Sequence, residues 1–345
     1  MTYLIRLAIV FALTLLGGCE GKEALYQEQG YVFGTLVDVS IYGEPEPRAK
    51  QAVSDVMREF QRLHDMLHAW KPSELSELNA AFAKGESMAV SAELVAILQD
   101  ATQLSEQSNR LFNPAIGGLV RLWGFHADEF KPAQPDEKLI AQWVAADPKM
   151  SDISITQGRV QSKNKSVQVD LGGYAKGYAL DRAVELLHKQ GINNALVNIG
   201  GNVIALGQHG KRPWRIGIQH PRKPGAMATL ALHDGEAIGT SGDYQRYFMV
   251  GDVRYCHLIN PRSGYPMQGV QAVTILTRGK HAGTLSDAAS KPLFISGTNG
   301  WRDAARQMNL PEAMLIDSQG VVHLTGEMQK RLEFADRNIH PQVAP

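Results

Sequence analysis

The sequence predicts an α+β fold, a mixed α/β arrangement with largely antiparallel sheets and packed helices. Apolar residues recur at helical spacing over two stretches in the first third of the chain, whereas the part from Trp214 onward alternates short β-type runs with turn residues. Between them, residues 167–201 follow the order strand, Gly-rich turn, helix, strand, Gly-rich turn. With 345 residues, 44% hydrophobic and 20% charged, the chain has an ordinary globular composition, and it could form one large α/β unit or two intertwined subdomains.

The N-terminus carries a predicted targeting segment. Arg6 is followed by the apolar run 7–16, which is shorter than the about 20 residues of a membrane-spanning helix and is typical of a signal peptide. The run Leu16-Gly17-Gly18-Cys19 resembles a bacterial lipobox, which implies cleavage before Cys19 and acylation of its thiol; an ordinary signal peptide with a chance cysteine is the alternative. The predicted organisation is a lipoprotein signal peptide at 1–18, a tether at 19–30, one folded domain at 31–337 and a loose tail at 338–345.

Composition also restricts the partners. The only cysteine besides Cys19 is Cys256, so no disulfide framework is expected and Cys256 is predicted to be a lone thiol. The formal net charge is zero and no long basic run occurs, which argues against nucleic acid as a partner. An anionic ligand would therefore have to be held by a local cluster of charges.

The first half of the folded domain is predicted to contain a strand and two helices. Residues 31–42 have the β-type pattern of a strand. A helix is predicted over 49–67, because its apolar residues form one stripe, and another begins at the N-cap Ser91. Residues 126–137, with two prolines and several acids, are predicted to be a surface insertion.

The Gly-rich unit is predicted to hold an anionic group. Residues 167–171 alternate as in a half-buried strand, and Gly172-Gly173 permits a tight turn. The helix that follows would present free backbone N–H groups at its start, beside Lys176. The pattern matches neither GxGxxG nor a Walker loop, so tight packing without a ligand is the alternative.

The second half is predicted to consist mostly of strands and turns. Two helices, near 286–294 and 300–308, are expected to close the core. The predicted strand-rich runs are WRIGIQHP, TLALHDGEAIGTSG, YFMV, RYCHLINPRSGYP and VQAVTIL, between Trp214 and Leu276.

Two local patterns have both a chemical and a structural interpretation. His64 and His68, four residues apart on a predicted helix, could bind a metal, but without a third ligand a polar helix flank is favoured. Glu74 and Glu77 could form an acid/base pair, but together with Ser73 they are more typical of a helix N-terminus.

A histidine at a strand end is a further candidate. His257 stands in a strand-like run just before residues 260–264, whose sequence NPRSG is a turn signature. An imidazole in this position could serve as a general base near neutral pH, although a structural role is commoner for a single histidine.

Taken together and in order, these motifs resemble the ApbE family of flavin transferases over residues 34–297, nearly the whole domain. Each block alone is weak evidence, and the series of eight carries the resemblance. The blocks are Phe33-Gly34-Thr35, His68-Ala69-Trp70 with SELSELN (73–79), Phe112-Asn113-Pro114-Ala115 with Leu122-Trp123-Gly124-Phe125, DLGGYAKGYALD (170–181), VNIGGN (197–202), SGDYQRYF (241–248), CHLINPRSGYP (256–266) and SDAASKPLFISG (286–297).

The resemblance implies an enzyme that binds FAD, splits its pyrophosphate with help from Mg²⁺, releases AMP and attaches FMN through a phosphoester to a Thr or Ser of a partner flavoprotein. It also implies that His257 is the base for the acceptor hydroxyl and that Asp287 is a catalytic, metal-binding carboxylate. The residues implied to contact the flavin nucleotide are Phe33, Trp70, Leu111, Phe112, Asn113, Gly172, Lys176, Tyr178, Asp181, Gly200, Gly201 and Ile259.

The metal site implied by the resemblance contains the Ala175 carbonyl, the Asp287 carboxylate and a threonine four residues further on, where this chain has Lys291. Lysine has donors but no acceptor, so Lys291 cannot coordinate a cation. At i, i+4 on a helix, Asp287 and Lys291 are predicted to form an ion pair. Either the ammonium replaces the metal beside phosphate, or the protein binds flavin without the usual transfer.

The leading interpretation is an FMN-transferring lipoprotein, anchored in a bacterial inner membrane on the periplasmic side, with a membrane or periplasmic flavoprotein as acceptor. Two alternatives use the same site. One is an FAD pyrophosphatase that gives FMN and AMP. The other is a non-enzymatic flavin-binding lipoprotein, which the lysine at position 291 suggests.

Overall fold

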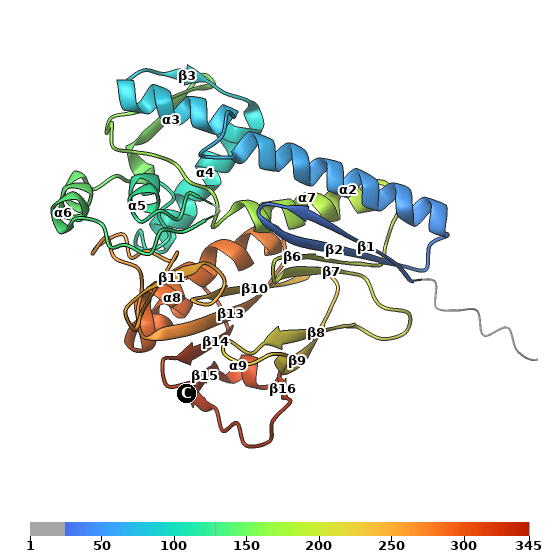
Figure 1. Cartoon of the computed structure of the whole chain (residues 1–345). Coiled ribbons are helices and arrows are strands. Elements are labelled where there is room, and N and C mark those ends of the chain that lie inside the picture. The colour runs from blue at the N-terminus through green and yellow to red at the C-terminus, as the bar shows by residue number, and fades with distance from the viewer. Residues whose placement is uncertain (1–24, 128, 345) are drawn as a thin grey trace, which may run out of the picture.

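The computed structural model describes residues 25–127 and 129–344 of the chain (Figure 1). The predicted signal peptide and the lipidated Cys19 lie outside these residues. In the described part of the chain, none of the helices combines the length and the apolar character that crossing a membrane requires.

Within the described ranges, a nine-stranded sheet forms the centre of the fold (Figure 1). Its strands, in spatial order, are β1 (Leu25–Val32), β2 (Thr35–Tyr42), β6 (Ala195–Ile199), β7 (Asn202–Leu206), β10 (Glu236–Gly242), β13 (Val270–Arg278), β14 (Glu312–Asp317), β15 (Val322–Thr325) and β17 (Gln342–Ala344). Every neighbouring pair is antiparallel except β15 and β17. The predicted α+β class with largely antiparallel sheets is confirmed.

Shorter strands and helices surround this sheet. The smaller sheets contain β3 (Met88–Ala89), β5 (Arg159–Ser162) and β4 (Ile153–Thr156); β11 (Tyr247–Val250) and β12 (Val253–Cys256); and β16 (Glu333–Phe334), β9 (Ala226–Leu232) and β8 (Trp214–Gln219). The helices are α2 (Glu46–Leu67), α3 (Glu74–Lys84), α4 (Ala92–Gln107), α5 (Gly117–Leu122), α6 (Glu137–Ala146), the 3₁₀ turn η2 (Met150–Asp152), α7 (Ala175–Lys189), α8 (Ala282–Gln307) and α9 (Gly326–Gln329).

Both faces of the central sheet are covered. Helices α2, α7 and α8 pack on one face, and β8 and β9 lie on the other (Figure 1). In β14, Ala313 and Leu315 belong to the helix-side core, whereas Met314 and Ile316 belong to the core under β8 and β9. Because side chains alternate along a strand, a run that is apolar at every position must be buried on both faces.

The predicted helices are confirmed, with small shifts at their ends. α2 begins slightly earlier than predicted, because Pro47 suits the first turn of a helix. The side chain of Ser91 caps α4 as predicted. The two helices predicted near 286–294 and 300–308 are the halves of α8, which leaves helical geometry at Gly297 (φ 66°, ψ −172°).

The N-terminal hairpin corrects two predictions. Residues 25–30, predicted as part of a tether, belong to β1, and the predicted strand 31–42 is broken by a turn at Phe33 and Gly34. Both turn residues have positive φ, 55° and 70°, as a tight two-residue hairpin turn requires. This conformation strains a phenylalanine, but the Phe33 ring packs against Phe60 with 6.2 Å between ring centroids.

The structure also corrects the prediction for the segment before the Gly-rich turn. Residues 167–171, predicted as a strand, pair only through one isolated bridge, between Gln168 and Ile116. Asn79 of α3 supplies the missing partners, since its side chain accepts the Val169 N–H at 2.7 Å and donates to the Val169 carbonyl at 2.9 Å. Because both residues are buried, this clamp fixes the chain that leads into the Gly-rich turn.

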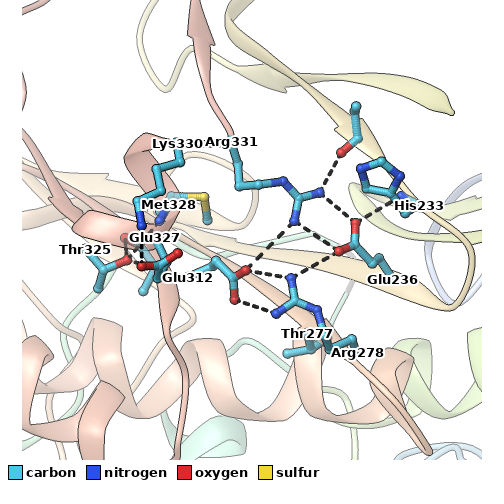
Figure 2. Close-up of polar contacts among 12 residues, drawn as sticks. His233, Glu236, Thr277, Arg278, Glu312, Thr325, Glu327, Met328, Lys330 and Arg331 are labelled. Carbon is cyan, nitrogen blue, oxygen red and sulfur yellow. Dashed lines mark hydrogen bonds and ion pairs between the residues drawn. The ribbon is translucent and has the colours of Figure 1, made fainter.

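The C-terminal region is attached by strand pairing and by charges. Residues 342–344, predicted as part of a loose tail, form β17 and pair in parallel with β15. Figure 2 shows Arg331, after α9, donating to both carboxylate oxygens of Glu236 in β10. Arg278 of β13 donates to Glu236 and to Glu312 of β14. These four side chains, the Glu236 cluster, join three central strands to the C-terminal segment.

Candidate functional site

A cleft of about 810 Å³ runs from the Phe33 turn past the Gly-rich turn to α8. It brings together most of the predicted site residues, although their contacts with a ligand stay predictions. Those that line it are Phe33, Trp70, Leu111, Phe112, Asn113, Gly172, Ala175, Lys176, Gly200, His257, Ile259, Asp287 and Lys291. Tyr178, Asp181 and Gly201 are not among its lining residues.

The Gly-rich turn is held between its own helix and α8. Lys176 Nζ donates to the Gly172 carbonyl at 3.3 Å, so the lysine folds back over the turn. The two helices touch at Gly177, where a Cβ would lie only 2.3 Å from the Gly283 carbonyl oxygen. This close approach lets the Gly177 N–H donate to Asp287 Oδ2 at 3.1 Å. One N–H group of the helix start, predicted to be free for an anion, is therefore occupied.

Asp287, Lys176 and Lys291 form a charge cluster in the cleft, here the Asp287 cluster. Lys291 Nζ donates to Asp287 Oδ1 and, at 2.6 Å, to the Asp287 carbonyl, which confirms the predicted i, i+4 ion pair. Lys176 Nζ lies 3.8 Å from the same Oδ1. Burial opposes ionisation of Asp287, but the two lysine charges outweigh it and hold the pKa of Asp287 at about 2. Burial lowers the pKa of Lys291 to about 8, against the pull of Asp287, so its ammonium is still mostly protonated at pH 7 and the cluster carries close to one surplus positive charge.

The donor set of this cluster does not suit Mg²⁺. Asp287 is fully buried, and its two carboxylate oxygens already accept from Lys291 and from the Gly177 N–H. Lys291 offers no lone pair, whereas Mg²⁺ requires oxygen ligands. In residues 25–127 and 129–344, no group of three or more His, Cys, Asp or Glu side chains is placed to hold a metal ion.

His257 faces the same cleft from the end of β12. Its Nδ1 lies 3.3 Å from the Arg246 carbonyl oxygen, and a carbonyl can only accept, so this nitrogen carries the proton and Nε2 keeps its lone pair. Burial lowers the pKa of His257, and the positive charges of Arg246, Lys176 and Lys291 lower it further, to about 3. The imidazole is thus neutral at physiological pH, as a general base must be. Its neighbour Cys256 is a free, buried thiol, as predicted.

Arg246 is a cleft residue to which the sequence motifs assigned no role. Its guanidinium donates to the carbonyls of Phe125 (2.8 Å) and Ala127 (3.2 Å) and lies over the Phe130 ring, 5.4 Å from its centroid. Its own carbonyl holds His257. Arg246 therefore ties the loop after residue 125 to the histidine; its presence in the block SGDYQRYF was the available signal, but the partners are distant in sequence.

Aromatic rings form part of the wall of the cleft. The His64 ring lies between Phe33 and His68, with centroid distances of 5.7 Å and 5.1 Å. His68 Nδ1 accepts the Trp70 N–H at 3.1 Å, and the indole contacts the His126 ring at 5.5 Å. His68 follows the last residue of α2 and both rings line the cleft, so these contacts confirm neither the polar-flank nor the metal-binding interpretation. The wall offers flat surfaces on which a planar ring system can stack.

The start of the SELSELN block has structural partners. Ser73 is the N-cap of α3, and it exchanges hydrogen bonds with Ser76 in a capping box. Glu74 accepts from the Ser91 hydroxyl at 2.8 Å and so links the starts of α3 and α4. The interpretation of this block as a helix N-terminus is confirmed.

Asp181 and Tyr178 point away from the cleft. The Asp181 carboxylate accepts the N–H groups of Gly283 and Thr284, both at 2.8 Å, and the Thr284 hydroxyl at 2.6 Å. It therefore caps the start of α8 from outside that helix. The Tyr178 hydroxyl donates to Glu93 of α4 at 3.0 Å. Both residues position the helices that carry the Asp287 cluster.

Known proteins share both the sequence pattern and the fold. The ApbE family model matches residues 33–315. The FAD:protein FMN transferase of Rhodobacter capsulatus is 43% identical over 333 residues, which are 96% of this chain but 63% of that protein's length. The FAD:protein FMN transferase of Treponema pallidum is 31% identical over 84% of each chain. The crystal structure of the ApbE protein of Thermotoga maritima superposes with a TM-score of 0.81 at 28% identity, over 89% of this chain and 99% of that one. Sequence and fold together show that the chain belongs to the ApbE family.

Proposed function

We propose that this protein is an FAD:protein FMN transferase, which moves FMN from FAD to a hydroxyl of a partner flavoprotein. The observation that carries the proposal is the Asp287 cluster, with its surplus positive charge, in the same cleft as the neutral His257. Two relatives named as such transferases support it. FAD is the proposed substrate, and a Thr or Ser of the partner is the acceptor.

The proposed reaction is an in-line displacement at the phosphorus of the FMN half of FAD. The acceptor oxygen forms a new P–O bond, the bond from that phosphorus to the bridging oxygen breaks, and AMP leaves with the bridging oxygen. His257 Nε2 takes the proton of the acceptor hydroxyl. Lys176 and Lys291 stabilise the negative charge of the pyrophosphate as it is redistributed. Charges and atoms balance without a further reactant.

Mass spectrometry of an acceptor peptide incubated with the protein and FAD tests this function. We expect a peptide heavier by one FMN phosphoester and one AMP released for each peptide modified. His257→Ala should lower the rate of transfer about 100-fold, the usual effect of losing a general base, while FAD affinity stays within about twofold. His188→Ala, at an exposed position late in α7, is the matched control.

The same experiment separates the alternatives. Release of FMN and AMP without acceptor, at the rate seen with acceptor, would make water the natural nucleophile and the protein an FAD pyrophosphatase. Binding of FAD with no product in either case would make it a flavin-binding protein. No affinity for FAD at micromolar concentrations would remove all three interpretations.

The proposed location is the periplasmic face of a bacterial inner membrane, where the protein would be held by a lipid on Cys19. The proposal rests on the sequence alone, on the apolar run 7–16 and the residues Leu16 to Cys19. The acceptor would then be a membrane or periplasmic flavoprotein. Mass spectrometry of the mature N-terminus checks this, because an unlipidated start at another residue contradicts it.

A further inference from the structure

We infer that Lys291 replaces the divalent metal of the ApbE pattern: its ammonium is a built-in cation that binds the pyrophosphate of FAD. The inference rests on the proposed function for the identity of the ligand. Its own evidence is the placement of the lysine, the charge of the Asp287 cluster and the state of the Asp287 oxygens.

The Lys291 side chain is fixed in the cleft and is only 13% exposed. Its stem passes the Gly-rich turn so closely that a Cβ on Gly173 would lie 3.2 Å from Lys291 Cε and 3.8 Å from Cδ. Its Nζ donates hydrogen bonds to both the backbone carbonyl and the side-chain carboxylate of Asp287. An ammonium has three donors. Among the residues that the structure describes, the third has no acceptor and is left for a ligand that enters beside the turn.

The charge balance favours a phosphate at this place. Lys176 and Lys291 share the single carboxylate of Asp287. A bound pyrophosphate would therefore meet a net positive charge without any metal. Phosphate oxygens are strong acceptors, and hydrogen bonds between an ammonium and an anion are among the stronger ones in proteins.

A divalent cation, in contrast, would meet obstacles at the same position. It would have to share Asp287 Oδ1 with the Lys291 ammonium or Oδ2 with the Gly177 N–H. It would also lie next to two ammonium groups and gain only one carboxylate. The lysine therefore does more than omit a metal ligand: it occupies the carboxylate with the opposite charge.

Calorimetric titration of FAD, in EDTA and in Mg²⁺, tests the inference on the parent and three variants. The parent should bind FAD equally well in both buffers, within about twofold. Lys291→Met should weaken binding about 10- to 100-fold in both, the range for losing a charged hydrogen bond. Lys291→Thr should lose as much FAD affinity in EDTA and regain it in Mg²⁺. This variant should also bind Mn²⁺, which electron paramagnetic resonance can follow. Lys50→Met, at an exposed position of α2, should change nothing.

Two measurements keep folding defects apart from the effect on binding. Riboflavin, which has no phosphate, should bind all variants with one affinity. The double variant Lys291→Met/Asp287→Asn leaves no buried carboxylate without its partner and keeps the positive charge of Lys176, so it should bind FAD more tightly than Lys291→Met but more weakly than the parent, because the Lys291 donor is missing.

The outcomes distinguish this inference from the function on which it rests. A parent that binds and uses FAD only with Mg²⁺, and is indifferent to Lys291→Met, would overturn the role of the lysine and leave the transferase proposal intact. A parent that binds FAD in EDTA but transfers no FMN would refute the transferase and leave the cation site in place.

Discussion

At the scale of single residues, the protein sets the protonation state of His257 before any substrate arrives. Burial is the largest cause, and three cations from different segments, Arg246, Lys176 and Lys291, add to it, so the pKa of His257 is about 3. A neutral imidazole surrounded by positive charge is a weak base. Two phosphate charges would cancel part of that field, so substrate binding should raise the basicity of His257 where it is needed.

This predicts an unusual pH profile. Since the group is neutral above its folded-state pKa, kcat/KM for FAD should stay level from pH 7 down to about 4, instead of falling near the usual imidazole pKa of about 6.5. Arg246→Met removes one of the three positive charges near His257, so the pH below which kcat/KM falls should be higher in this variant than in the parent. Circular dichroism at each pH checks that the fold persists. If kcat/KM of the parent protein falls near pH 6.5, the cleft does not lower the pKa of His257.

At the scale of elements, the Gly-rich turn depends on a helix that is remote in sequence. Asn79 of α3 satisfies both backbone groups of Val169, which no strand does. A side chain thus substitutes for a sheet partner and sets the approach of the chain to the Gly-rich turn.

Asn79→Ala should therefore destabilise the fold by about 3 kcal/mol, because two buried backbone groups each lose a partner worth about 1–3 kcal/mol. Chemical unfolding in urea measures the loss. The exposed Asn338→Ala should stay within about 0.5 kcal/mol of the parent. FAD binding should weaken as well, since the turn loses its support. Equal stability of Asn79→Ala and Asn338→Ala would mean that water replaces the clamp without cost.

At the scale of the whole molecule, the Glu236 cluster connects the central sheet to the C-terminal segment (Figure 2). Burial alone would raise the pKa of Glu236, but hydrogen bonds from Arg331, from the His233 N–H and from Arg278 hold it at about 2. The folded-state pKa lies below the ordinary value. The stabilisation is therefore complete above pH 5 and is lost as the pH falls toward 2.

Arg331→Met should lower the free energy of unfolding by about 2 kcal/mol at pH 7. The value is below that for breaking a fully buried pair, because Arg278 still faces Glu236. The difference from the parent should shrink as the pH falls from 5 toward 2. Its neighbour Lys330→Met, which loses only an exposed pair with Glu327, should change stability by less than about 0.5 kcal/mol. A difference independent of pH would assign the loss to packing.

The sequence by itself determined the features that depend on near neighbours. The apolar stripe of α2, the Ser91 cap and the Asp287–Lys291 pair each involve residues within a few turns of one helix, so spacing and side-chain chemistry suffice to predict them. The hairpin turn at Phe33 could not be predicted in this way, because a phenylalanine adopts a positive φ only where packing compensates for the strain.

Only the tertiary structure decided which distant groups meet. The motif that contains Asp181 predicts a contact with the ligand. In the structure the Asp181 carboxylate instead accepts two N–H groups at the start of α8, from residues 102 and 103 positions further along the chain. Asn79 pairs with Val169 over 90 residues, and Glu236 with Arg331 over 95. The partner of a buried polar group and the pKa of a histidine such as His257 depend on burial and on charges from several elements, and these exist only once the chain has folded.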